Sequence, residues 1–66
     1  MAYGSFTDIE HCNILNESSM AIEVESDGEV MWFPRSRIRS GDNYAAGDED
    51  QTIGFTDWIL DQKGWS

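Results

Sequence analysis

The fold of this chain is decided by one stretch, MAIEVESDGEVMWFP, at residues 20–34. Before Asp27-Gly28, apolar and other residues alternate with the period of a half-buried strand. Asp-Gly is favoured in two-residue hairpin turns, because both turn positions need positive φ. The stretch therefore predicts two antiparallel strands joined at Asp27 and Gly28.

A two-residue turn also fixes which residues of the two strands lie opposite each other. On one face it pairs Val24 with Met31 and Ile22 with Phe33. We expect these four apolar side chains to form the core. On the other face it pairs Glu23 with Trp32 and Glu25 with Val30. That face mixes carboxylates with large apolar groups and should be at least partly wet.

The flanking sequence predicts the rest of a small sheet. Residues 8–15 can form a further strand, although their apolar residues do not alternate cleanly, and residues 16–19 suit a turn. Pro34 cannot donate a ladder hydrogen bond and should close the second hairpin strand. Residues 40–50 lack apolar periodicity and read as a loop, followed by a short strand at residues 51–54.

The C-terminal segment carries helix signals at both ends. Thr56 is a suitable N-cap, and Asp57 places a negative charge in the first turn. A left-handed Gly64 would let Trp65 fold back on Leu60. We expect three residues to be packing anchors: Trp58, Ile59 and Trp65. The predicted fold class is α+β, with a three- or four-stranded antiparallel sheet and one C-terminal helix in a single domain over residues 1–66.

Length and composition bound the class of protein. A chain of 66 residues buries only about 60% of the surface that its unfolded form exposes. The active form is expected to be a monomer, or a homodimer whose interface buries further surface. The aromatic content of 12% argues against disorder. Cys12 is the only cysteine and is expected to be a small buried hydrophobe. Without a signal or membrane-span pattern, the expected location is the cytoplasm, that of the host cell if the chain is phage-encoded.

The charge of the chain is strongly one-sided. Thirteen acidic and four basic residues give a formal net charge of -9, and three of the basic residues are Arg35, Arg37 and Arg39. Such a field attracts basic partners and repels nucleic acid and anionic membrane. We therefore expect no direct nucleic-acid partner and no membrane association.

Catalytic and metal motifs are weak. His11 is the only histidine, and no carboxylate pair lies in a setting that would raise its pKa. The acidic run at residues 48–50 does not match a calcium loop, because the required Gly and Glu fall out of register. The sequence predicts a protein that is not an enzyme and that needs no cofactor or metal.

Two binding hypotheses remain, beside the plain possibility that the acids only keep the protein soluble. In the first, the hairpin acids Glu23, Glu25, Asp27 and Glu29 form a row, with Asp8 and Glu10 on a neighbouring strand and the run at residues 48–50 as further contacts. This acidic surface imitates DNA phosphates and occupies a basic groove on a protein. Its residues are Asp8, Glu10, Glu23, Glu25, Asp27, Glu29, Asp48, Glu49 and Asp50. In the second, Trp32 with Arg35, Arg37 and Arg39 binds a protein or single-stranded nucleic acid, unless these arginines pair with carboxylates of the fold.

The segment VESDGEVMWFPRSRI, at residues 24–38, resembles a segment of small acidic proteins of phages and prophages, and residues 53–65 look like their closing helix. The pattern is an acidic hairpin followed by Trp, an apolar residue, Pro, a basic residue and Ser. By type, the chain is also similar to anti-CRISPR proteins that act as DNA mimics. This resemblance implies a phage-derived inhibitor of a host defence complex, with a CRISPR effector subunit as a possible partner, and it assigns no role to a particular residue.

Overall fold

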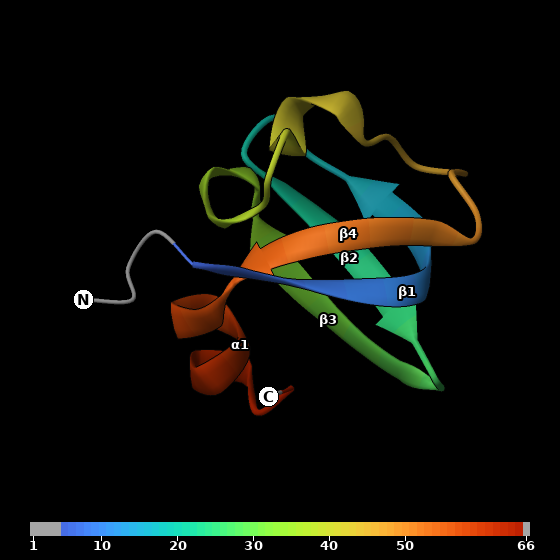
Figure 1. Ribbon diagram of the computed structural model, residues 1–66. Helices are drawn as coiled ribbons and strands as arrows, with labels where there is room; N and C mark the ends of the chain where they lie inside the picture. The colour runs from blue at the N-terminus through green and yellow to red at the C-terminus, as the bar shows by residue number, and fades with distance from the viewer. Residues whose placement is uncertain (1–4, 66) are drawn as a thin grey trace.

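The computed structural model describes residues 5–65 and contains four strands and one α-helix (Figure 1). The strands are β1 (Phe6–Glu17), β2 (Ala21–Ser26), β3 (Glu29–Pro34) and β4 (Gln51–Thr56), and the helix is α1 (Asp57–Lys63). The strands form one antiparallel sheet in the order β3-β2-β1-β4. The predicted α+β class, with an antiparallel sheet and a C-terminal helix, is confirmed.

The hairpin of β2 and β3 has the predicted turn and register. Asp27 and Gly28 have φ values of 54° and 87°, the positive values that a two-residue turn requires. Val24 pairs with Met31 as expected, and all the remaining pairs between β2 and β3 have the same register. The strand ends at Pro34, after which a 3-10 turn spans Arg35–Arg37.

Strand β1 is longer than predicted because it serves two neighbours. Its first half pairs with β4 and its second half with β2, and the register shifts between Ile9 and Cys12 and between Ile14 and Asn16. These irregularities explain why its apolar residues do not alternate in sequence. The sheet bends along β1, so that β4 and the first half of β1 cross in front of β2 and β3 in Figure 1.

The core lies between the two halves of the bent sheet. Its buried residues are Cys12, Ile14, Ile22, Val24, Phe33, Ile38, Ile53, Phe55, Ile59 and Leu60. The rings of Phe33 and Phe55 lie 4.5 Å apart, and Trp65 meets Phe33 at 5.0 Å in an edge-on arrangement. Such pairs add to the stabilisation from burial. The predicted core face of the hairpin is confirmed, with Met31 partly buried.

Helix α1 has the predicted caps. The Thr56 hydroxyl accepts the Ile59 N–H at 3.2 Å. At the other end, Gly64 has a φ of 78°, and the Trp65 N–H donates to the Leu60 carbonyl at 2.9 Å. This closure folds Trp65 back onto the aromatic core. Ile59 and Trp65 are packing anchors as predicted, but Trp58 is 41% exposed, because it lies on the face of α1 that points away from the core.

No helix among residues 5–65 has the length and apolar character needed to cross a membrane.

Replacing Thr56 with Ala should lower the free energy of unfolding by about 1 kcal/mol, because the first turn of α1 loses its capping acceptor. Urea denaturation followed by tryptophan fluorescence measures this change. The Thr56→Ser variant keeps the hydroxyl and serves as the matched control, with a smaller expected loss. Equal stability of the Ala variant and the wild type would show that this cap contributes nothing.

Candidate binding surface

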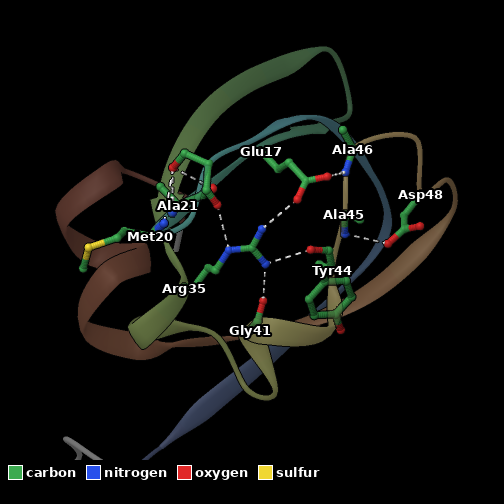
Figure 2. Close-up of polar contacts among 10 residues, drawn as sticks. Glu17, Met20, Ala21, Arg35, Gly41, Tyr44, Ala45, Ala46 and Asp48 are labelled. Carbon is green, nitrogen blue, oxygen red and sulfur yellow. Dashed lines mark hydrogen bonds and ion pairs between the residues drawn. The ribbon is translucent and has the colours of Figure 1, made fainter.

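Arg35 is the most highly connected polar side chain of the described structure (Figure 2). Its guanidinium donates from Nε to the Ser18 carbonyl at 3.1 Å, and from Nη1 to the carbonyls of Gly41 and Tyr44 at 2.8 and 2.7 Å. Its Nη2 lies 3.3 Å from a Glu17 carboxylate oxygen. The side chain is only 10% exposed. Arg35 therefore ties its own 3-10 turn to the β1–β2 turn and to the loop at residues 40–50, and its guanidinium is not free to bind a ligand.

The surrounding loop is built around this guanidinium. The second oxygen of Glu17 accepts the Ala46 N–H at 2.9 Å, which extends the network to the loop before β4. A Cβ on Gly41 would lie 2.3 Å from the Arg35 carbonyl oxygen, so only glycine fits there. The loop at residues 40–50 is thus held by specific contacts, and it contains a second 3-10 turn at Gly41–Asn43.

The other two arginines lie over different parts of the molecule. The Arg37 guanidinium carbon lies 4.6 Å from the centre of the Trp58 ring on α1. Arg39 pairs with Asp8 at 3.1 Å and lies 4.9 Å from the Phe6 ring. The arginine cluster of the sequence is therefore divided among separate contacts. Arg35 and Arg39 pair with carboxylates of the fold, which is the alternative to ligand binding that the sequence allows.

Asp8 and Asp48, two of the nine predicted acidic site residues, contact neighbouring segments of the fold, and a third, Asp50, pairs with His11 at 2.6 Å. The Asp8 carboxylate is the partner of Arg39. Asp48 is half-buried and accepts the Ala45 N–H at 2.9 Å. Asp48 is thus used within its own loop, whereas the Asp8 side chain remains 56% exposed beside Arg39.

Glu23 and Glu25 lie on the outer face of β2, where asparagines of β1 orient their carboxylates. The Asn16 side-chain amide donates to Glu23 at 2.7 Å, and that of Asn13 donates to Glu25 at 2.7 Å. The Asn13 hydrogen bond, with one from the Gly28 N–H, lowers the pKa of Glu25 below its ordinary value. Asn13 and Asn16 were not among the predicted site residues, because their role depends on the register between β1 and β2.

The hairpin acids do not form one row. The register places Glu29 on the face of β3 that carries Met31 and Phe33, whereas Glu23 and Glu25 lie on the opposite face of the hairpin. Successive residues of a strand alternate between faces, and the two-residue turn does not reverse this assignment. The single row expected from the sequence is therefore wrong in this respect.

The remaining predicted acids gather at one end of the sheet. The turn that contains Asp27 and the loop that leads into β4, with Glu49 and Asp50, both lie at the right of Figure 1. Asn13 joins them, because its side-chain oxygen accepts the Asp50 N–H at 2.9 Å while its amide holds Glu25. Exposed Glu10 lies in β1 beside the first register shift. The acidic surface is thus an end of the sheet and one outer face.

Metal and thiol chemistry have no support in the described residues. Among residues 5–65, no group of three or more His, Cys, Asp or Glu side chains is arranged to hold a metal ion. Cys12 is buried as predicted, and burial raises the pKa of its thiol. A buried thiol of raised pKa is a poor nucleophile.

Comparison of the chain with protein-family models, curated proteins and solved structures found no match.

The Arg35→Lys variant should lose about 2 kcal/mol of unfolding free energy, because an ammonium group cannot reproduce the forked hydrogen bonds to three carbonyls. Arg37→Lys is the matched control and should lose less than about 0.5 kcal/mol, as expected for a surface substitution. Chemical denaturation of both variants measures the difference. Equal losses would contradict the role of Arg35.

His11 and Asp50 predict a pH dependence. Their side chains lie 2.6 Å apart, and the hydrogen bond and charge of Asp50 raise the pKa of the imidazole above its ordinary 6.5. Since the folded state favours the protonated form, this contribution to stability is complete below pH 6.5 and is lost as the pH rises through the folded-state pKa.

An NMR titration of the His11 ring protons tests this pair. Asp50→Asn should return the pKa toward the ordinary value, while Glu49→Gln, a neighbouring loss of charge without this contact, should leave it nearly unchanged. A pKa that is the same in Asp50→Asn and the wild type would refute the pairing.

Proposed function

We propose that this chain is a non-catalytic binding protein whose acidic surface occupies a basic nucleic-acid-binding groove of another protein. One observation carries the proposal. The fold places Arg35 in internal hydrogen bonds and pairs Arg39 with Asp8, while it orients Glu23 and Glu25 outward with asparagine donors. The charge offered to a partner is consequently mostly negative, with exposed Arg37 the arginine that has no carboxylate partner among residues 5–65.

Orientation of the carboxylates supports mimicry of a phosphate backbone. Alternate residues of a strand stand about 6.8 Å apart, which equals the rise of about two base pairs along the DNA axis, at about 3.4 Å each. Glu23 and Glu25 are alternate residues of β2. Because their side chains are already held by hydrogen bonds, less side-chain entropy is lost when they meet a basic groove.

The resemblance to phage proteins and the type of anti-CRISPR inhibitors make a host defence complex the favoured target class, with a CRISPR effector as one instance. The inhibitor would prevent the target from holding its own nucleic acid. The second sequence hypothesis, binding of single-stranded nucleic acid through the arginines, is the less favoured function, because the Arg35 guanidinium is occupied within the fold.

The test uses capture from a bacterial lysate followed by competition. The immobilised protein should capture a nucleic-acid-binding protein at low salt and release it at high salt, because exposed ion pairs are screened. In a gel-shift assay, the wild-type chain should prevent the captured protein from binding DNA and should not shift DNA itself. Capture of no such protein, or a direct shift of DNA by the chain, would overturn the proposal.

Charge-neutral variants localise the interface. Glu23→Gln with Glu25→Gln keeps a carbonyl acceptor for each asparagine and removes two charges. This double variant should compete about tenfold less well, in line with the loss of 1 to 2 kcal/mol of interaction. The control, Asp42→Asn with Asp61→Asn, removes the same charge from a loop and from α1 and should compete nearly as well as the wild type. Equal weakening of both would assign the effect to net charge alone.

A further inference from the structure

The two edge strands of the sheet, β4 and β3, differ in how far other segments cover them. Along β4, the Arg39 N–H donates to the Gly54 carbonyl at 2.8 Å, and the Tyr44 hydroxyl donates to the Thr52 carbonyl at 3.2 Å. Ile38 adds a β-bridge to Phe55. These contacts cover one edge. Strand β3 forms the other edge, and no other segment of residues 5–65 covers it with hydrogen bonds.

The register shows which backbone groups of β3 are free. In an antiparallel pair, residues alternate between those bonded to the partner strand and those whose N–H and C=O point away from it. The two-residue turn closes on Ser26 and Glu29, so Met31 and Phe33 face β2. The Arg35 N–H donates to the Met20 carbonyl at 2.8 Å. This bond continues the same alternation, because Arg35 follows Phe33 by two residues. Val30 and Trp32 therefore direct both backbone groups outward.

The side chains of the same two residues are exposed apolar groups. Val30 is 47% exposed and Trp32 is 43% exposed, both on the outer face of β3. Beyond Trp32, an open groove of about 1000 Å³ continues past Pro34 and is bordered by Met20, which is 76% exposed. Natural proteins normally protect a sheet edge with charges, prolines or covering segments. Here Pro34 limits the edge at one end and Glu29 places a charge at the other, with exposed Val30 and Trp32 between them.

We propose that the edge of β3 binds an extended, basic segment of a partner protein, which adds to the sheet as a fifth strand. Outward N–H and C=O groups of Val30 and Trp32 would supply the main-chain hydrogen bonds, and their side chains would contact alternate residues of the segment. This interface goes beyond the proposed function, because it needs neither a nucleic-acid groove nor phosphate mimicry.

Charge selects the kind of occupant. The carboxylates of Glu23 and Glu25 lie on the neighbouring strand, on the same face as the exposed apolar groups, and the carboxylates of Asp27 and Glu29 lie at the turn. Lys63 borders the groove at the opposite end. Basic residues of the segment would therefore lie toward the turn. A second copy of the chain, with a net charge of -9, is disfavoured as the occupant by repulsion.

A synthetic peptide tests the edge directly. The probe is an acetylated, amidated heptapeptide with Lys residues in one half and Val residues in the other, and the control peptide replaces each Lys with Glu. Binding of the Lys peptide should slow hydrogen exchange of the Val30 and Trp32 amides about tenfold or more in NMR, because these amides gain partners. The Glu peptide should not bind. Absence of binding, or binding without protection of these amides, overturns the proposal.

Substitutions at the edge complete the test. Trp32→Pro removes an outward N–H that β2 does not use, which an edge strand tolerates, and should weaken peptide binding about tenfold. The double variant Val30→Lys with Trp32→Lys keeps the backbone donors and repels a basic segment, so it should also lose binding. It provides the test if the proline variant does not fold. Unchanged binding by a folded variant overturns the proposal.

Two further measurements separate this inference from its alternatives. Sedimentation of the protein alone should show no dimer that depends on the β3 edge. A dimer that the double lysine variant disrupts would make a second copy the occupant and would overturn the proposal. Competition with DNA, which tests the acidic surface, should be unchanged in Trp32→Pro. Failure at the β3 edge and failure of the proposed function are therefore distinguishable.

Discussion

The guanidinium of Arg35 is the interaction on which the surface of this protein depends. It follows Pro34 at the end of β3, and it holds the β1–β2 turn and the loop before β4 through carbonyl oxygens. A buried guanidinium is tolerated only when its donors are satisfied, and here each nitrogen has a partner. The loop in turn supplies the Tyr44 hydroxyl to the edge of β4. A single positive charge thus sets the position of segments from three parts of the chain.

Local patterns were enough to predict the hairpin, its register and the caps of α1. Asp27-Gly28 allows few turns, and the identity of Thr56 and Gly64 reflects backbone geometry at one position each. The length of β1 was not predictable, because its bulges depend on pairing with two strands at once. The internal role of Arg35 was also not predictable, because main-chain carbonyls accept its hydrogen bonds and every residue type has such a carbonyl.

The sequence singles out the acidic residues of the candidate surface, but the row that it predicts for the hairpin acids is wrong. Alternation in the hairpin already separates Glu29 from Glu23 and Glu25, and the structure shows that this separation persists. The sequence also could not reveal that Asp8 has a cation of its own or that Asn13 connects Glu25 with the Asp50 backbone. Long-range contacts decide which carboxylates are free, and such contacts require the fold.

The pairing of β1 with β4 has a consequence for the order in which the chain can fold. Phe6 lies opposite Thr56, and the sheet cannot close around its core until the last quarter of the chain is present. The β2–β3 hairpin needs only neighbouring residues, whereas closing a loop of about fifty residues carries a larger entropy cost. During synthesis on the ribosome, the hairpin can form while the chain is still growing. The aromatic core, in which Trp65 packs against Phe33, can be completed only after β4 and α1 have been made.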